Sequence, residues 1–289
     1  MKSAEIVELK DAINTKELIS SSKHAHLQKV AIVGAGCGDI ELLTVKATRL
    51  ISAADAIIYD SLVSEDILDL ASSACEMHFA GKRCGQPSAK QADINQLILT
   101  CAKRGLNVVR LKGGDPNVFG RGCEESLFLA QHGVASHFVP GVTAALGCAA
   151  SAGIPLTHRG VARSVTLVTG TVVDGAAKNG VHWQALLSIK STLVFYMGKE
   201  QAAHIAHSLL SAGASTELPM VFISSGARSE QKLTFADLGT MSDAARQLEV
   251  LGPTLMIVGE VVNVGQGLAE LLSQIEPHSL TDKALCESA

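Results

Sequence analysis

The sequence predicts an α/β protein built from two α/β domains, and three observations lead to that prediction. The chain has 289 residues, which is long for one domain and comfortable for two. It is 47% hydrophobic but only 3% aromatic, with 26 glycines, so it suits a large aliphatic core with many turns. Strand-like apolar segments alternate with helical ones, which indicates a mainly parallel sheet with ligands beyond the carboxyl ends of its strands.

The alternation also sets the expected domain bounds. We expect an N-terminal tail at residues 1–27, a first domain at 28–157, a second at 158–264 and a C-terminal tail at 265–289. The first segment is polar and weakly patterned, as chain ends often are. The segment 153–160 interrupts the alternation with glycine and proline and is typical of an interdomain connection.

Five strands are expected in the first domain, at residues 29–33, 56–59, 76–80, 108–111 and 136–139. Helices are expected at 42–51, 64–71 and 91–104, from Glu124 onward, and after Thr143. The run from Val108 to Leu111 suits a strand that is buried on both faces. The acidic pair Glu124 and Glu125 suits the positive end of a helix dipole.

Each of these five strands ends in a Gly, Asp or Lys motif. The motifs are 34–39, Asp60, 81–83, 112–115 and 140–143. Because the carboxyl ends of parallel strands meet at one edge of a sheet, their recurrence indicates a ligand site. Gly113 and Gly114 would let backbone N–H groups approach a ligand, although residues 113–116 taken alone are more typical of a simple tight turn.

The second domain repeats the pattern with strands at 164–169, 192–196, 219–223 and 254–258. A helix is expected at 201–211, and a hairpin or irregular segment around 231–235. Its strands also end at glycine-bearing motifs: Gly170, 197–198, 224–227 and 259–260. The sequence therefore favours two α/β domains with a cleft between them.

The net charge of −4 gives no reason to expect a nucleic-acid partner. Basic residues nevertheless gather in and beside the glycine-rich loops: Lys82, Arg83, Arg110, Lys112, Arg121, His158, Arg159 and Arg163. This local charge favours a polyanionic small molecule. The alternative is that each is an ordinary solvated charge.

The remaining features exclude several protein classes. The seven cysteines include no C-x-x-C pair, so neither a zinc ribbon nor a disulfide framework fits. The N-terminus has no apolar signal core, and no apolar run is long enough to span a membrane. We therefore expect a cytoplasmic protein. The absence of G-x-x-x-x-G-K-[ST] argues against a P-loop nucleotidase.

The glycines after the first strand suggest one competing function. Gly34, Gly36 and Gly38, with Asp60 some way on, resemble a dinucleotide fingerprint. The fingerprint requires its third glycine three positions after the second, whereas here it follows after two. A dinucleotide-dependent oxidoreductase therefore stays an alternative with an imperfect motif.

A set of ordered motifs resembles the uroporphyrinogen-III C-methyltransferase family of tetrapyrrole methylases. The motifs are VAIVGAGCGDIELLTVKA, AIIYDSLVS, GKRCG, VVRLKGGDPNVFGRGCEE, FVPGVTAALGCAASAGIPLTHR, TLVFYMG and GPTLMIVGEVV, over roughly residues 29–264. The resemblance implies two α/β/α domains, S-adenosylmethionine in the interdomain cleft, and a homodimer. It also implies two methyl transfers to uroporphyrinogen III, giving precorrin-2 for sirohaem or cobalamin synthesis, with S-adenosylhomocysteine as the other product.

The resemblance implies site residues as well. Asp60 matches the family's proposed base, and Lys82 matches its proposed proton donor, although Lys82 is equally suited to clamp a substrate carboxylate. The cofactor-binding positions are Cys37, Gly113, Gly114, Asp115, Val118, Thr143, Ala144, Met197 and Gly226. Substrate contacts are expected from Arg83, Lys112, Arg121, His158 and Arg159. The reaction needs no metal, because the methyl group moves from a sulfonium by in-line displacement.

The chain departs from the family pattern at five positions: Cys37, Pro87, Asn117, Cys123 and Thr171. Cys37 stands where proline is usual and Asn117 where phenylalanine is usual, so cofactor affinity is the property that we expect these to change. From its length we expect methylation alone, without the dehydrogenase-chelatase module that some relatives carry. Two more functions stay open: a precorrin methylase with a different tetrapyrrole substrate, and a catalytically silent tetrapyrrole carrier.

Overall fold

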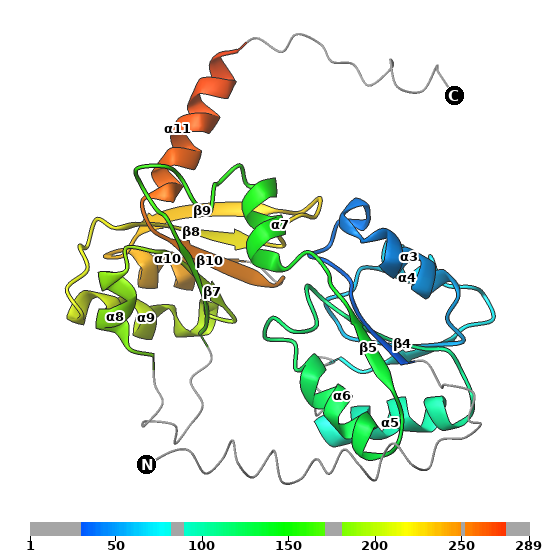
Figure 1. Cartoon of the computed structure of the whole chain (residues 1–289). Helices are drawn as coiled ribbons and strands as arrows, with labels where there is room; N and C mark the ends of the chain where they lie inside the picture. The colour runs from blue at the N-terminus through cyan, green and yellow to red at the C-terminus, as the bar shows by residue number, and fades with distance from the viewer. Residues whose placement is uncertain (1–29, 82–89, 171–180, 250–251, 276–289) are drawn as a thin grey trace, which may run out of the picture. The chain divides into compact units, whose positions relative to one another are not determined.

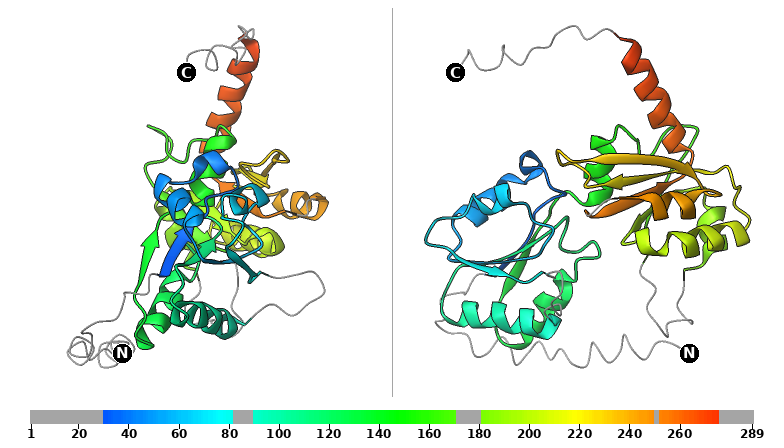
Figure 2. Two further views of the ribbon diagram at one scale, coloured as in Figure 1. Left: turned by 90° about the vertical axis from the view of Figure 1, so that its right-hand side faces the viewer. Right: turned by 180° about the vertical axis from the view of Figure 1, so that it is seen from behind.

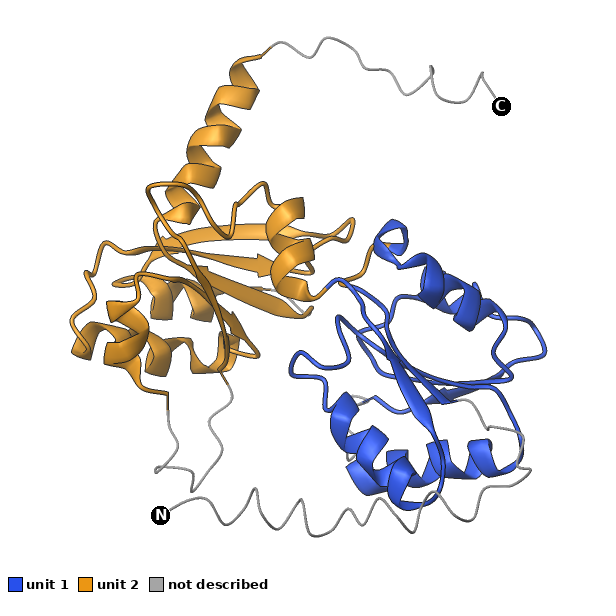
Figure 3. Cartoon of the chain, viewed as in Figure 1, with its two compact units in different colours: residues 1–36, 40–142 blue, residues 37–39, 143–289 orange. Residues whose placement is uncertain are grey.

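A computed structural model describes residues 30–81, 90–170, 181–249 and 252–275 of the chain. It divides into two compact units (Figure 3). Unit 1 contains residues up to Gly36 and Ile40–Val142, and unit 2 contains Cys37–Asp39 and the chain from Thr143. The boundary therefore falls at Val142 and not at residue 157 as we expected.

Unit 1 contains one parallel sheet of five strands in the order β3-β2-β4-β1-β5. The strands are β1 (Val30–Gly34), β2 (Ala56–Tyr59), β3 (Glu76–Phe79), β4 (Val108–Lys112) and β5 (Ser136–Val139). In the central pair, Val30 lies opposite Val108 and Gly34 opposite Lys112. The expected strands are confirmed to within one residue at each end.

Two helices cover each face of this sheet (Figure 1). They are α3 (Val45–Ser52), α4 (Glu65–Leu68), α5 (Gln91–Lys103) and α6 (Gly122–Gln131). Side chains alternate along β1, so Val30 and Ile32 pack against α5 and α6 while Ala31 and Val33 pack against α3 and α4. Burial on both faces explains the nearly unbroken apolar runs of the strands.

Unit 2 contains a mixed sheet in the order β6-β7-β10-β8-β9. The strands are β6 (Val165–Thr169), β7 (Thr192–Tyr196), β8 (Pro219–Ser224), β9 (Lys232–Asp237) and β10 (Thr254–Val258). Only β6 and β7 pair in parallel; the other three pairings are antiparallel. The parallel arrangement of unit 1 therefore does not recur in unit 2, where β8 and β9 form the hairpin that we gave as one possibility around residues 231–235.

The helices of unit 2 are α7 (Ala144–Ser151), α8 (Trp183–Ser188), α9 (Ala202–Ser211), α10 (Met241–Gln247) and α11 (Val261–Gln274). One sheet face packs against α8, α9 and α10. The other packs against α7 and the start of α11. Because α7 packs on the core of unit 2 through Ala145, Cys148 and Ala149, it belongs to that unit.

The last helix, α11, differs from expectation. Its sequence continues as helix past residue 264, where we expected a polar tail to begin. Only its first turns are buried, and its second half extends away from the sheet of its own unit (Figure 2). Among the described residues, none of the helices has the length and apolar character needed to cross a membrane.

Candidate functional site

Three glycines from three neighbouring strands of unit 1 meet through their backbones. Gly34 ends β1, Gly114 follows β4 and Gly141 follows β5. A Cβ on Gly34 would lie 2.5 Å from the nitrogen of Gly141 and 2.6 Å from the oxygen of Gly114. Gly36 and Gly114 also exchange backbone hydrogen bonds of 3.2 and 2.6 Å. The three loops approach so closely that only glycine fits at these positions. The clustering of strand-end motifs in the sequence predicts that these loops meet.

Asp60 is held beside this glycine junction by backbone donors. Its carboxylate accepts hydrogen bonds from the N–H of Leu62, at 2.9 Å, and of Gly113, at 3.3 Å. A Cβ on Gly113 would lie 2.5 Å from the Cβ of Leu62, so a larger residue would separate the two loops. Asp60 is half-buried. A carboxylate that is fixed in this way keeps unused lone pairs and is suited to accept a proton.

Asp115 connects two loops of the same unit. One carboxylate oxygen accepts from the N–H of Asn117 at 2.8 Å, and the other accepts from the N–H of Gly141 at 3.2 Å. Val118, two residues beyond Pro116, is half-buried. The carboxylate thus orders the loop whose residues were expected to hold a cofactor.

A buried group of charges lies behind the loop. Arg110 and Lys112 on β4 both contact one oxygen of Glu125 on α6, at 3.1 and 3.2 Å. Burial is the main cause that lowers the pKa of Lys112; the nearby charge of Arg110 lowers it further, and Glu125 opposes both. Lys112 was expected to bind substrate, but in this structure its Nζ lies inside unit 1 against Glu125.

The other basic residues differ in exposure. Arg121 is exposed, adopts a left-handed conformation with φ 59°, and pairs with Glu124 at 2.6 Å. In unit 2, His158 and Arg159 are exposed and line an open cavity of about 450 Å³ together with Arg163. Lys82 and Arg83 lie outside the described residues, as do Pro87 and Thr171.

In unit 2 the end of β7 is tied to the start of α7. The hydroxyl of Tyr196 lies 2.7 Å from the hydroxyl of Thr143 and accepts a hydrogen bond from the N–H of Ala145 at 2.9 Å. Thr143 is the N-cap of α7 and is buried, and Ala144 is half-buried. Met197 follows Tyr196 with φ 53° and is exposed over 57% of its surface. Such a strained and exposed residue at a strand end is typical of a binding site.

The residues around Gly226 are also strained. Ser225 and Ala227 both have positive φ, at 48° and 58°. A Cβ on Gly226 would lie 2.7 Å from the Cβ of Cys148, so glycine is required there. The Cys148 thiol hydrogen-bonds with that of Cys37, an interaction that lowers the pKa of Cys37 and raises that of Cys148.

The described site residues that the structure brings together thus form one group in unit 1 and two separate groups in unit 2. Unit 1 brings together Asp60, Gly113, Gly114 and Asp115. Unit 2 ties Thr143 to the end of β7, and separately brings together Cys37, Cys148 and Gly226. Sequence reasoning missed Leu62 and Tyr196; an aromatic hydroxyl directly before Met197 was the available signal for the latter.

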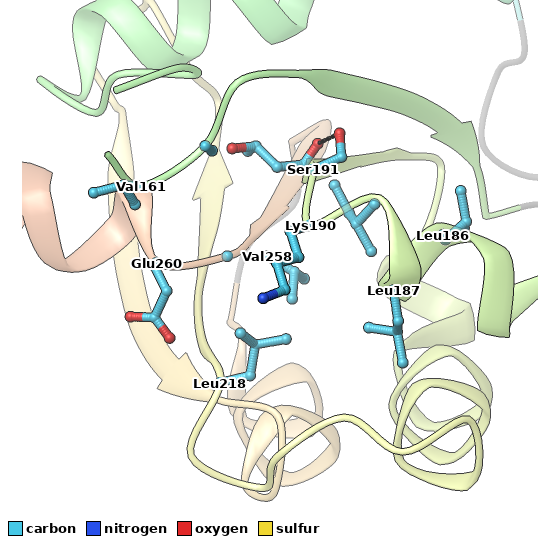
Figure 4. Close-up of a pocket in the computed structure, with 12 residues that line it drawn as sticks. Val161, Leu186, Leu187, Lys190, Ser191, Leu218, Val258 and Glu260 are labelled. Carbon is cyan, nitrogen blue, oxygen red and sulfur yellow. Dashed lines mark hydrogen bonds between the residues drawn. The ribbon is translucent and has the colours of Figure 1, made fainter. Parts of the chain in front are cut away.

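A separate cavity lies at the opposite end of the sheet of unit 2 (Figure 4). It has a volume of about 220 Å³ and is lined by residues that precede β7 and β8 or follow β10, including Lys190, Leu218 and Glu260. Met197 and Gly226 follow β7 and β8 instead. This cavity is therefore not part of the candidate site.

The strand-end loops indicate the class of protein, because glycine-rich loops with a carboxylate held beside them are typical of α/β proteins that bind a small molecule. A family model described as Tetrapyrrole (Corrin/Porphyrin) Methylases matches residues 29–242. The chain therefore belongs to the tetrapyrrole methylases, which confirms the family and the enzyme class, a methyltransferase, that the motifs predict.

Relatives and solved structures agree with this assignment. The chain is 46% identical over 261 residues to a siroheme synthase of Psychromonas ingrahamii, covering 90% of this chain and 54% of that protein. A siroheme synthase of Stutzerimonas stutzeri is 46% identical over 243 residues, covering 84% and 52%. The chain spans about half the length of these curated relatives.

Among solved structures, a uroporphyrin-III C-methyl transferase from Thermus thermophilus, complexed with S-adenyl homocysteine, has a TM-score of 0.69 and 40% identity. The match covers 82% of this chain and 99% of that one. A cobalt precorrin-4 methyltransferase, with a TM-score of 0.73 and 24% identity, shares the fold.

Proposed function

We propose that the protein transfers two methyl groups from S-adenosylmethionine to uroporphyrinogen III, giving precorrin-2. The observation that carries the proposal is the match to 99% of the uroporphyrin-III C-methyl transferase chain at 40% identity. The loops of this chain suit the same donor, because the close backbone approach of Gly34, Gly114 and Gly141 holds the glycine-rich loops after β1, β4 and β5 together at one end of the sheet. The bound donor supplies a methyl group on a sulfonium.

The residues of this chain would then position the donor and the substrate and take up the proton that leaves the macrocycle. Transfer to a pyrrole carbon leaves a proton that must depart from the macrocycle, and Asp60 is a fixed carboxylate that can accept it. Lys82 stays a proposed proton donor or carboxylate clamp. Backbone groups at Gly113, Gly226 and the strained Met197 are proposed to hold the donor.

The substrate side of the proposal rests on exposed cations. Uroporphyrinogen III carries eight acidic side chains, and His158, Arg159 and Arg121 are exposed and able to meet carboxylates. Arg83 stays a proposed contact. Lys112 would contribute only through a change in its contact with Glu125, because its ammonium is buried in that pair.

We further propose that the protein is a cytoplasmic homodimer. Five cysteines among the described residues are free thiols, which suits a reducing compartment. The exposed leucines 268, 271 and 272 on α11 are apolar surface that an interface would cover. Sedimentation at micromolar concentration should give twice the chain mass; a monomer there would contradict the dimer.

Ligand binding tests the donor assignment against the oxidoreductase alternative. Isothermal titration should show saturable binding of S-adenosylhomocysteine and no binding of NAD or NADP. The Asn117→Phe variant restores the residue that is usual in the family. Comparing its affinity for S-adenosylhomocysteine with that of the wild type shows what Asn117 changes. Binding of a nicotinamide dinucleotide with no binding of S-adenosylhomocysteine would overturn the proposal.

A further inference from the structure

Three side chains with metal-binding atoms converge at the edge of unit 1, away from the glycine loops. Glu76 and His78 lie on β3, which is the edge strand of the sheet, and Cys101 lies on α5. One ligand atom from each lies within 4.8 Å of the others. The proposed methyl transfer uses none of the three.

The local structure explains why they meet. Residues two apart on a strand point to the same face, so Glu76 and His78 face the same way. The helix α5 packs on that side of the sheet, and its buried face presents Cys101 among the core residues of unit 1. The carboxylate, imidazole and thiol therefore come from two elements that are already fixed by packing.

The distances suit a tetrahedral ion. His78 Nε2 lies 3.9 Å from Cys101 Sγ and 3.5 Å from Glu76 Oε2. Zinc bonds of about 2.0–2.3 Å in tetrahedral geometry place ligand atoms roughly 3.3–3.8 Å apart. Small side-chain movements would thus close the site. His78 is 30% exposed and Glu76 38%, which gives an ion and a water ligand access from solvent.

We propose that Glu76, His78 and Cys101 form a binding site for a zinc-class divalent ion. Sulfur and imidazole nitrogen select zinc or cobalt over magnesium or calcium, which prefer oxygen ligands. Binding replaces the thiol proton of Cys101 with the metal and releases that proton to solvent. The ion would cross-link β3 to α5 and thereby stabilise the edge of the parallel sheet.

Arg104 competes with the metal for Glu76. It is the C-cap residue of α5, three residues after Cys101, and its guanidinium holds both oxygens of Glu76 at 2.8 and 2.5 Å. Because the Arg104 side chain is 51% exposed, it can leave the carboxylate without disturbing the core. Removing Arg104 frees one ligand and removes a positive charge, so the variant should bind the ion more tightly.

The test is a Co²⁺ titration of the metal-stripped full chain under anaerobic conditions. We expect one ion per chain, with a thiolate-to-cobalt charge-transfer band and d–d bands of tetrahedral intensity, both displaced by Zn²⁺. Cys101→Ser should abolish the charge-transfer band. His78→Gln should weaken binding by more than about 100-fold, because even the partners that orient a metal's ligands contribute about 10- to 100-fold.

Two further variants separate this site from adventitious thiol binding. Cys75→Ser is the matched control: Cys75 neighbours Glu76 but is not one of the three ligands, so its loss should leave the bands unchanged. Arg104→Gln should bind more tightly, and Zn²⁺ should raise the Tm of the wild type but not that of His78→Gln. No band in the wild type, or a band that survives Cys101→Ser, overturns the proposal.

Discussion

At the residue scale, the sequence predicted which loops lie close together where that closeness depends on glycine backbone. Glycine before a carboxylate at a strand end is a local signal, and Gly113, Gly114 and Asp115 do lie beside Asp60 and Gly141. The contact of Tyr196 with Thr143 was not predictable, because its partners lie far apart in sequence and either hydroxyl alone is ordinary. Likewise, no local signal showed that Lys112 is buried.

Asp60 gives the first prediction. Asp60→Ala should lower turnover by about 10²- to 10⁴-fold, the usual contribution of a general base, while S-adenosylhomocysteine binding is retained. Steady-state rates and isothermal titration measure the two effects. Asp66→Ala, an exposed carboxylate on the following helix, is the control. Undiminished turnover in Asp60→Ala would remove Asp60 from the mechanism.

Cys37 should be the more reactive of the two paired thiols. The hydrogen bond from Cys148 is the main cause that lowers the pKa of Cys37, whereas the pKa of Cys148 is raised by the same contact and by burial. Because the thiolate is the nucleophile, iodoacetamide at neutral pH should alkylate Cys37 before Cys148. Peptide mass spectrometry shows which cysteine is alkylated first. Bound donor should protect Cys37 from alkylation. Faster alkylation of Cys148 would refute this assignment.

At the element scale, strand positions were predictable but their directions in unit 2 were not. Buried strands are short apolar runs with glycine after them, and β2, β5, β7 and β10 begin and end where the sequence predicts. Direction depends on the connections: the β8–β9 hairpin reverses the chain, so β9 and β10 run opposite to β6, β7 and β8 in a mixed sheet. The end of α11 was missed because its second half buries little apolar surface.

The glycine junction between β1, β4 and β5 predicts a specific loss of stability. In Gly34→Ala the new methyl group meets backbone atoms of Gly114 and Gly141, which cannot move aside as a flexible side chain would. We expect the free energy of unfolding to fall by about 1–3 kcal/mol, a typical cost of overpacking. Gly267→Ala on α11 meets no atom within 4 Å and should be neutral or stabilising. Urea unfolding compares them, and equal stability would contradict the packing account.

The buried pair between β4 and α6 predicts a pH dependence. Burial lowers the pKa of Lys112 in the folded state, so between that value and the unfolded value of about 10.4 the unfolded chain binds more protons. The free energy of unfolding should therefore rise with pH across this window. Lys112→Met should remove that part of the slope in urea unfolding at alkaline pH, below the unfolded value of about 10.4. Identical slopes would show that Lys112 titrates normally.

At the scale of the whole molecule, the order of the motifs predicted more than any single motif. One glycine loop left a dinucleotide enzyme open, whereas seven motifs in order predicted a family that the match over residues 29–242 confirms. The division between units was less predictable. The small residues of α7 pack on unit 2, so the boundary precedes that helix instead of following it.

The central claim is double methylation of one tetrapyrrole, and product mass tests it most directly. The full chain is incubated anaerobically with S-adenosylmethionine and uroporphyrinogen III, and mass spectrometry counts the methyl groups added. The account predicts a product with two added methyl groups, reached through a singly methylated intermediate. A tetrapyrrole without added methyl groups, from protein shown to bind S-adenosylhomocysteine, would contradict the proposed substrate.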